Sequence, residues 1–508
     1  MLDFATILAG LGDAFSPTNL IFVIAGIIIG QFVGAIPGIG PVMTMAIAIP
    51  FTFILNPLPA LSLLIGIHKG GLVGGAIPAI LINTPGTPDA AATALDGYPL
   101  TKKGKPLKAT KMALYSSITG DVFSDLVLIT VSVPLAALAL KMGLIEIFAL
   151  MIFSFSIIAG LVGDTISKGI IAACLGILCA CIGLDPENST PRFIFGNFTL
   201  YDGLPIASVA IGMLAVSEIF RRLASMENAT RAAIVIPKNQ SPEDTRISFK
   251  EYWAVRYTLL RGATIGTILG AIPGVGSTAA AFMSYAFQKN SSKNPNSYGK
   301  GNIKGIAATE SANSSVAGAD FIPLLTLGLP GSASAALIIS AFLVQGIQPG
   351  PLLFQEQGRL IYGLFGAMIM ANMVNFGVGL FGMRLWIKIV SAPESVIFSS
   401  AILLCIVGVY LSTGGMFGVV IMLIFALLGY IMNMLGFPTV VFIIAFFLGD
   451  RFELSLGQTL NILDGDYADL VNHPVAIGLI LLAMGSIYFF MFKMPNATKN
   501  TTDELSED

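Results

Sequence analysis

A short apolar sequence built around a Pro-Gly pair occurs twice in this chain, once in each half. Residues 30–41 contain Gly-Ala-Ile-Pro-Gly-Ile-Gly, and residues 266–277 contain Gly-Ala-Ile-Pro-Gly-Val-Gly, with seven of twelve aligned positions identical. A further Pro-Gly pair follows each copy, at residues 85–86 and 330–331. Each pair interrupts a strongly apolar stretch, where the proline removes a backbone hydrogen bond and the helix is expected to break.

The composition places these breaks inside a membrane. Hydrophobic residues make up 55% of the chain and charged residues 11%, whereas a soluble domain carries roughly 25% charged residues. Apolar runs of about 20 residues, enough to span a bilayer, recur between residues 20 and 492. The sequence therefore predicts an all-α polytopic membrane protein.

Backbone that is broken at membrane depth is tolerated only where it is buried in protein or lines a wet cavity. Paired breaks at corresponding positions of two halves indicate the binding site of a secondary transporter. The alternative is that the glycines only allow helices to pack closely. Close packing does not require a proline beside the glycine, which favours the interpretation as a binding site.

The distribution of basic residues predicts the topology, because Lys and Arg in short loops mark the cytoplasmic side. No Lys or Arg precedes Lys69, so the N-terminus and the loop at residues 56–59 are expected outside. Sixteen of the 27 basic residues lie in three segments, 102–111, 221–256 and 288–304, which are expected inside.

Residues 258–287 therefore start and end on the cytoplasmic side. About 30 residues at 1.5 Å each cross a bilayer only once as a straight helix, so this segment must fold back at its Pro-Gly pair. Residues 20–54 start and end outside by the same argument. The sequence predicts two inverted-topology repeats, with about eleven transmembrane helices and two re-entrant hairpins that have Pro-Gly tips. The N-terminus is expected in the periplasm and the C-terminus in the cytoplasm.

The predicted organisation has four parts. The first repeat is expected at 1–220, with its hairpin at 20–54 and a broken helix at 59–100, and a cytoplasmic linker follows at 221–256. The second repeat is expected at 257–453, with its hairpin at 258–287 and a broken helix at 305–346. The last part, 454–508, holds a periplasmic loop, a final transmembrane helix and an acidic cytoplasmic tail.

The four Pro-Gly elements suit the binding of an anion. A helix that begins after each pair presents unpaired N–H groups and the positive end of its dipole, and unwound carbonyls of the same loops suit Na⁺. The predicted substrate-binding residues are Pro37, Gly38, Gly40, Asn83, Thr84, Pro85, Gly86, Thr87, Pro273, Gly274, Gly276, Ser277, Thr278, Leu329, Pro330, Gly331, Ser332 and Ser334.

Ionisable residues at membrane depth are further candidates. Asp121 and Asp125, four apart on one helix face, could bind a coupling proton or cation, or could pair with loop lysines near the cytoplasmic end. Lys69 could neutralise an anionic substrate or snorkel to the surface. Glu310 could cap a helix or bind a cation, and Asn313 could contribute to the site or bridge helices.

The sequence lacks the residues that other functional classes require. The chain has two histidines, no cluster of metal-ligating residues and no phosphate-binding Gly-x-x-x-x-Gly-Lys-Ser/Thr sequence, so neither an enzyme nor an ATP-driven pump is expected. The expected function is a symporter that uses Na⁺ or H⁺ and no other cofactor. An ion channel or a non-transporting membrane scaffold is the alternative. The expected surroundings are a lipid bilayer and a carboxylate substrate, without nucleic acid.

Two stretches carry a resemblance to a known family. Residues 74–88, continuing through 94–100, and residues 323–332, ending at 348–351, are similar to signature sequences of the large membrane subunit of the tripartite tricarboxylate transporters, the TctA-like permeases. The likeness extends from about residue 20 to residue 492.

This resemblance implies import of tri- or dicarboxylates across a bacterial inner membrane, driven by a cation gradient. It also implies two partners, a periplasmic solute-binding protein and a small four-helix membrane subunit. The chain departs from the family pattern in two places. His68-Lys69 stands where small or aromatic residues are expected, and residues 310–315 match an Asn-Asn pattern only in part.

Overall fold

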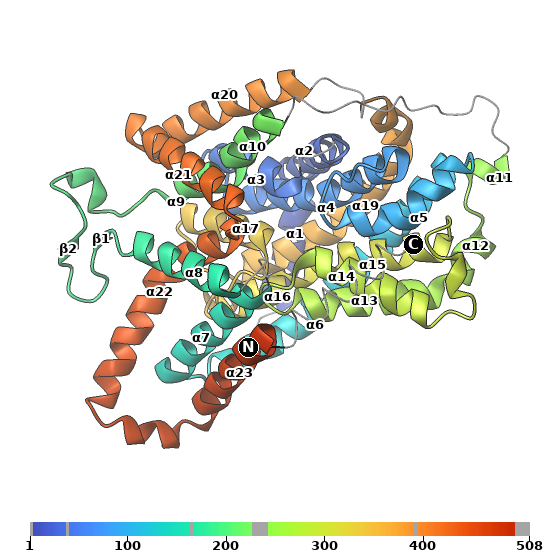
Figure 1. The fold of residues 1–508 in the computed structure, drawn as a ribbon. Helices are drawn as coiled ribbons and strands as arrows, with labels where there is room; N and C mark the ends of the chain where they lie inside the picture. The colour runs from blue at the N-terminus through green and yellow to red at the C-terminus, as the bar shows by residue number, and fades with distance from the viewer. Residues whose placement is uncertain (1–3, 37–39, 162–165, 226–241, 390–393, 493–508) are drawn as a thin grey trace.

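The computed structural model describes residues 4–36, 40–161, 166–225, 242–389 and 394–492. The described chain is mostly helical and contains two short strands, β1 (Gly183–Leu184) and β2 (Pro191–Arg192), which pair in an antiparallel hairpin (Figure 1). Five helices within these residues are long and apolar enough to cross a membrane, and seven further apolar helices are shorter in their described parts. The prediction of an all-α membrane protein is confirmed.

The first half of the chain begins most of its early helices at a proline, which is pre-organised for a first helical turn. Its elements are α1 (Phe4–Ala14), α2 (Pro17–Gly34), α3 (Pro41–Thr52), α4 (Pro57–Ile82), α5 (Ala90–Lys102), α6 (Pro106–Ala139), α7 (Leu144–Leu161), α8 (Ile166–Ala180), η1 (Phe198–Leu200), α9 (Ile206–Ala210), the π-helical η2 (Ile211–Val216) and α10 (Ser217–Ser225).

The second half of the chain is also mostly helical. Its elements are α11 (Pro242–Thr245), α12 (Phe249–Ala254), α13 (Arg256–Gly270), α14 (Gly276–Asn290), η4 (Pro295–Ser297), α15 (Ile303–Ala319), α16 (Phe321–Leu327), α17 (Ala333–Val344), α18 (Leu353–Glu356), α19 (Gly358–Ile389), α20 (Glu394–Thr413), α21 (Met416–Met434), α22 (Thr439–Leu463), η5 (Tyr467–Asn472) and α23 (Pro474–Phe492).

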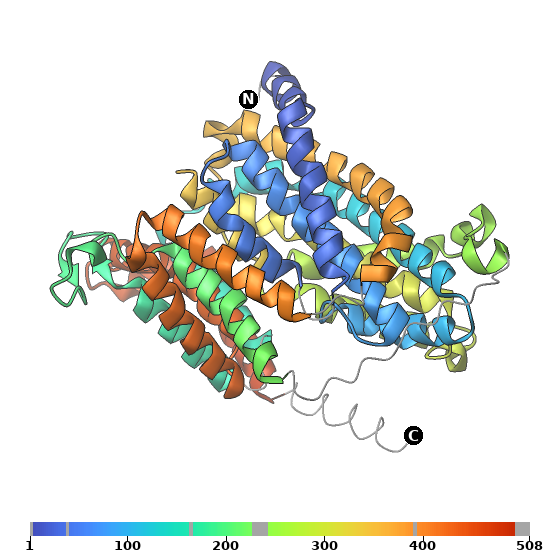
Figure 2. The ribbon, with the colours of Figure 1, turned by 90° about the horizontal axis from the view of Figure 1, so that it is seen from above.

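The helices form two groups, each built from both halves of the chain. We call α2, α4–α6, α13–α16 and α19 the tip bundle, because it holds the Pro-Gly elements, and α7–α10 with α20–α23 the wall bundle. Figure 2 shows α10, α20 and α21 of the wall bundle side by side and apart from the tip bundle. Helices α3 and α17 lie between the two groups and contact both.

Glycines allow α2 and α4 to approach closely. A Cβ added to Gly30 would lie 2.4 Å from the carbonyl oxygen of Ile67, and one added to Gly70 would lie 2.6 Å from that of Ile27. Small residues at such spacing bring helix backbones together in membranes. Close packing therefore explains these glycines, which lie on either side of the first Pro-Gly tip in the sequence.

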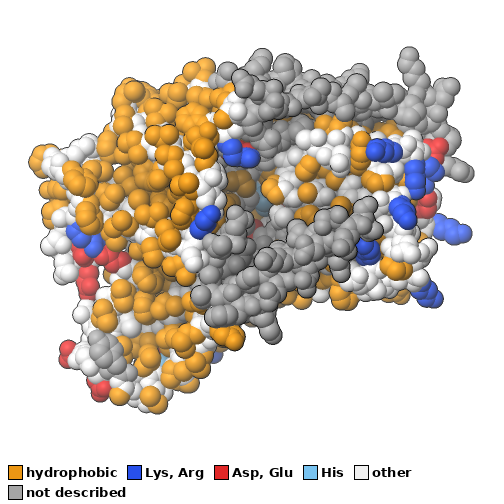
Figure 3. All heavy atoms as spheres, in the orientation of Figure 1, with side chains coloured by type: hydrophobic (Ala, Val, Ile, Leu, Met, Phe, Trp, Pro, Cys, Tyr) orange, Lys and Arg blue, Asp and Glu red, His pale blue; other side chains and the backbone are white. Residues whose placement is uncertain are grey.

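The described end of the linker is folded against α6. Lys108 pairs with Glu251 at 2.5 Å and Lys105 with Asp244 at 2.9 Å, and Ser248 and Glu251 form a capping box at the start of α12. Figure 3 shows Lys and Arg side chains gathered at this end of the molecule, over α5, α11 and α12, while hydrophobic side chains cover the opposite end.

Helix α22 is longer than predicted. The predicted second repeat ended at residue 453, before a periplasmic loop, but the helix continues to Leu463 and ends at Asp464, whose φ is 40°. No proline follows residue 452 until Pro474, and charge alone does not stop a helix. Arg192 of β2 pairs with Glu453 on this extension and lies 3.2 Å from Asp185.

Candidate functional site

The two broken helices end in the same way. Helix α4 ends at Asn83 in the left-handed conformation, with φ 56°, and α16 ends at Gly328, with φ 72°. In each case the N–H of the next residue donates to the carbonyl of a proline in the helix, Pro78 at 3.4 Å and Pro323 at 3.2 Å. A Pro-Gly pair then separates each helix from its continuation, α5 or α17.

Each hairpin tip lies against the break of its own half. The N–H of Gly274 donates to the carbonyl of Gly331 at 2.7 Å. In the first half, a Cβ on Gly86 would lie 2.3 Å from the carbonyl oxygen of Gly34, and the N–H of Gly86 donates to Gly75 at 3.1 Å. The contact at Gly86 leaves no room for a side chain, and at Gly331 an added Cβ would lie 3.0 Å from Asp320.

A cavity of about 550 Å³ opens between the tip bundle and the wall bundle. Four helix starts line it, each following one of the Pro-Gly elements: Gly40 at α3, Asp89 at α5, Ser277 at α14 and Ser334 at α17. The opposite wall comes from η2, α10, α21 and α22, and includes Glu218. The first turns of four helices therefore face one space.

This arrangement favours an anion. The first N–H groups of a helix have no partner within it, and the N-terminus carries about half a positive charge. Among the described residues that line the cavity, the charged side chains are Asp89, Glu218 and Arg221, and Arg221 pairs with Glu218 at 2.5 Å. Because Glu218 pairs with Arg221, the four helix ends are the remaining positive groups that these described residues offer to an anion.

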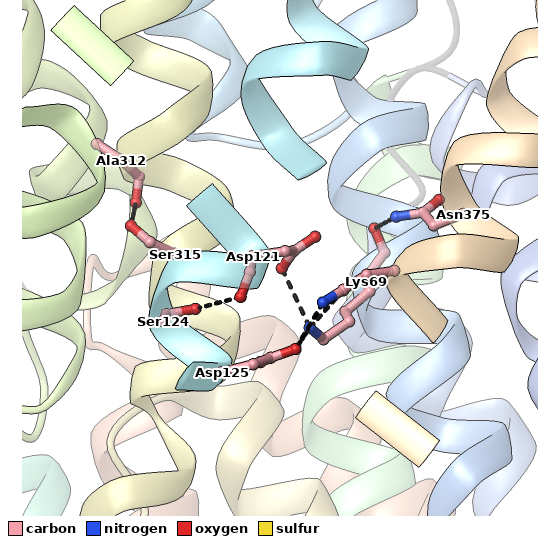
Figure 4. A network of polar contacts seen from close by, with 8 residues as sticks. Lys69, Asp121, Ser124, Asp125, Ala312, Ser315 and Asn375 are labelled. Carbon is pink, nitrogen blue, oxygen red and sulfur yellow. Dashed lines mark hydrogen bonds and ion pairs between the residues drawn. The ribbon is translucent and has the colours of Figure 1, made fainter. Parts of the chain in front are cut away.

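A second polar site lies within the tip bundle. Lys69 of α4 is 1% exposed, and its Nζ lies 2.7 Å from Asp125 and 3.4 Å from Asp121, both on α6 (Figure 4). Asn372 of α19 accepts from Lys69 at 2.8 Å and donates to Asp125 at 2.7 Å. The two acids thus pair with a buried lysine and not with loop lysines.

The same site is tied to α2 and α19. Asn375 donates to the carbonyl of Lys69 at 3.2 Å, as Figure 4 shows, and accepts from Gln31 at 2.6 Å. Trp386 donates to Gln31 at 2.9 Å. Lys69 therefore sits in a continuous polar network, does not snorkel, and is absent from the described residues that line the cavity.

Comparison with known proteins identifies the family. The model of the tripartite tricarboxylate transporter TctA family matches residues 20–444. The chain belongs to this family. It is also 33% identical over 488 residues, 96% of each chain, to an Agrobacterium vitis protein described as an uncharacterized 52.8 kDa protein in the TAR-I ttuC' 3' region.

A second Agrobacterium vitis relative, an uncharacterized protein in the TAR-II ttuC' 3' region, is 34% identical over 243 residues, which cover 48% of this chain and all of the relative. No solved structure matches. Family membership makes this TctA-family chain a multi-pass membrane component of a tripartite tricarboxylate transporter, and the family is one of transporters rather than enzymes.

The predicted substrate-binding residues of this TctA-family chain fall into three sets. Those that line the cavity are Gly40, Pro85, Gly86, Thr87, Ser277 and Ser334. Those that lie in the breaks and tips beside it are Asn83, Thr84, Pro273, Gly274, Gly276, Thr278, Leu329, Pro330, Gly331 and Ser332. Pro37 and Gly38 lie outside the described residues.

Four ionisable residues of the cavity wall were missed: His68, Asp89, Glu218 and Arg221. Asp89 directly follows Thr-Pro at the start of a helix, which is an N-terminal signature, so a search for acids beside the Pro-Gly elements would have found it. Glu218 and Arg221 carry no such signal, because their sequence is typical of the end of a span.

Glu310 and Asn313 lie on α15, and both are fully buried. Glu310 accepts from Thr93 at 2.5 Å and from Ser117 at 2.8 Å. The amide oxygen of Asn313 lacks a hydrogen-bond partner. These residues stand behind the cavity wall, next to the start of α5.

Proposed function

We propose that this protein is a secondary active importer of organic carboxylates of the tri- or dicarboxylate class, in symport with Na⁺ or H⁺. The observation that carries the proposal is the set of four helix N-termini, two from each half, that face one cavity. Such ends bind carboxylates without a buried arginine. Paired broken elements of two halves form the midplane sites of secondary transporters.

The arms of the hairpins support two inverted repeats. Helix α3 of the first half runs beside α17 of the second, where Gln345 donates to the carbonyls of Thr52 at 2.7 Å and Leu55 at 3.1 Å. Helix α14 of the second half runs beside α5 of the first, where Tyr285 donates to Asp96 at 3.0 Å. The second arm of each hairpin thus also contacts the broken helix of the other half, as expected for a twofold axis in the membrane plane.

The proposed topology has about eleven transmembrane helices and two re-entrant hairpins. Charged residues support the orientation, because the basic end over α5, α11 and α12 (Figure 3) is the expected cytoplasmic side. The N-terminus is then periplasmic, the C-terminus is cytoplasmic, and the membrane is the bacterial inner membrane. Substrate is delivered by a periplasmic solute-binding protein, and a small membrane subunit completes the transporter, as family membership suggests.

Alternating access is the proposed mechanism, because the cavity lies between two bundles rather than within one. The Lys69 site is a candidate for the coupling ion. Asp121 and Asp125 carry two negative charges against the single positive charge of Lys69. A buried excess charge is costly, so a bound proton or cation is expected there during the cycle.

The test is uptake into proteoliposomes that contain the protein, its small subunit and its binding protein. A panel of labelled citrate, C4-dicarboxylates and aromatic acids is offered with an imposed Na⁺ or H⁺ gradient. We expect saturable uptake of at least one carboxylate that collapses when the gradient is removed. Gradient-independent, non-saturating flux would indicate a channel, and no flux for any member of the panel would favour a scaffold; either result contradicts the proposal.

A further inference from the structure

Two carboxylates lie at the cavity wall without a basic partner, Asp89 in the lining and Glu310 behind it. Asp89 is 4% exposed and Glu310 is fully buried, and neither forms an ion pair with any described residue. The contrast with Asp121 and Asp125, which share Lys69, is clear. Uncompensated charges at this depth are far more costly than paired ones.

The two acids belong to one cluster across α5 and α15. Thr93, one helical turn after Asp89, donates to Glu310 at 2.5 Å. Asn313, one turn after Glu310 on α15, lies beside the Asp89 carboxylate, as does Ser277 of α14. Asp89 therefore faces Asn313, and Thr93, four residues further along the chain, faces Glu310.

Asn313 indicates what the cluster binds. Its side chain is fully buried, yet its amide oxygen lacks a hydrogen-bond partner, whereas buried polar groups are nearly always paired. An amide oxygen does not take up a proton under physiological conditions. An unpaired amide oxygen beside two carboxylates therefore points to a metal cation with oxygen ligands.

The small ligand set of the cluster suits a monovalent ion. The N-terminus of α5 offsets part of the charge of Asp89, by about half a unit, and the hydroxyls of Thr93 and Ser117 stabilise Glu310. No group of three or more His, Cys, Asp or Glu side chains that could hold a metal occurs in the described chain. A divalent ion with six to eight oxygen ligands is therefore disfavoured.

We infer that Asp89, Glu310 and Asn313 form a Na⁺ site directly behind the carboxylate cavity. The inference rests on the proposed function, in which a cation gradient drives uptake, and it names the ion and its ligands. Asp89 lines the cavity, so a Na⁺ held here places a positive charge against the bound carboxylate. This position couples the two ligands, since each strengthens the binding of the other.

The test is binding of radioactive Na⁺ to the purified full-length protein in carboxylate-free buffer, with choline as the balancing ion. Wild-type protein should bind saturably. Glu310→Gln and Asn313→Ala should weaken binding by roughly tenfold or more, in line with the loss of metal-site partners. Glu146→Gln is the matched control, because Glu146 is partly buried and pairs with His473 at 2.6 Å, away from the cluster; its binding should match wild type.

Asn313→Ala removes no charge, so it keeps the test decisive if Glu310→Gln fails to fold. Wild-type-like binding by a folded variant of either kind would overturn the site, as would equal competition by K⁺, Mg²⁺ or Ca²⁺. The uptake assay separates this failure from that of the proposed function. If uptake is driven by Na⁺ but the variants bind Na⁺ as wild type does, only the site is rejected. If the variants lose Na⁺ binding but uptake does not depend on Na⁺, the site is supported and Na⁺ symport is rejected.

Discussion

Valine at Gly86 or Gly331 is expected to abolish uptake. A Cβ atom at position 86 would lie 2.3 Å from the carbonyl oxygen of Gly34. A Cβ atom at position 331 would lie 3.0 Å from Asp320 and 3.2 Å from the carbonyl oxygen of Gly270. Either change pushes a hairpin tip away from its break and displaces a helix start that faces the cavity. Misplacement of a binding group by about 1 Å can reduce rates by about a hundredfold.

The measurement is the initial uptake rate divided by the amount of protein in the membrane. Gly176→Val is the control, because its Cβ would lie 2.4 Å from the carbonyl oxygen of Phe442, and neither residue lines the cavity. This control should lower thermal stability and expression while uptake per folded molecule remains near wild type. Normal uptake by both Gly86→Val and Gly331→Val would show that the breaks do not form the site.

Replacing Lys69 with methionine is expected to destabilise the protein strongly. The change leaves Asp121 and Asp125 buried, each 1% exposed, without the cation that both contact. Removal of one partner of a buried ion pair costs about 3–5 kcal/mol. We expect the double variant Lys69→Met/Asp125→Asn to recover part of that loss, since one of the two uncompensated charges is then gone.

The free energy of unfolding in detergent, measured by reversible denaturation, compares the single and double variants. A matched change at the surface, Lys105→Met, breaks a pair with Asp244 whose side chains are 41% and 29% exposed, and should cost at most about 1 kcal/mol. The account of the buried cluster is contradicted if Lys69→Met lowers the free energy of unfolding no more than Lys105→Met does. It is also contradicted if adding Asp125→Asn to Lys69→Met lowers the free energy of unfolding further.

The breaks themselves were predictable from the sequence because their cause is local. A proline cannot donate to the preceding turn, and the residue that ends each broken helix, Asn83 or Gly328, adopts a left-handed conformation that these residue types tolerate. The repeated sequence also placed each break in a corresponding part of its half. Local chemistry and repetition were enough to identify the helix starts that line the cavity.

Contacts between distant helices were not predictable in this way. Lys69 and Asp125 are 56 positions apart, and Lys69 and Asn372 are 303 positions apart, so no spacing rule connects them. The part of the cavity wall that comes from α10, α21 and α22 was also not predictable, because the sequence around Glu218 is typical of the end of any transmembrane span. Such features follow from the packing of the two bundles.

Protection of single cysteines by substrate tests the central claim that both halves form one carboxylate site. The free cysteines Cys174, Cys179, Cys181 and Cys405 are first replaced by alanine. Cysteines are then placed at Gly40 in the first half or Ser277 in the second, both of which line the cavity, and their rates of reaction with a thiol reagent are measured.

A transported carboxylate should slow the reaction at both positions, because it occupies the space between the helix starts. A cysteine at Gly478, where an added Cβ meets nothing within 4 Å, should react at the same rate with and without substrate. Protection at Gly40→Cys and Ser277→Cys, with none at Gly478→Cys, is the predicted result. Absence of protection at either cavity position, under conditions in which the same carboxylate is transported, would contradict a shared site.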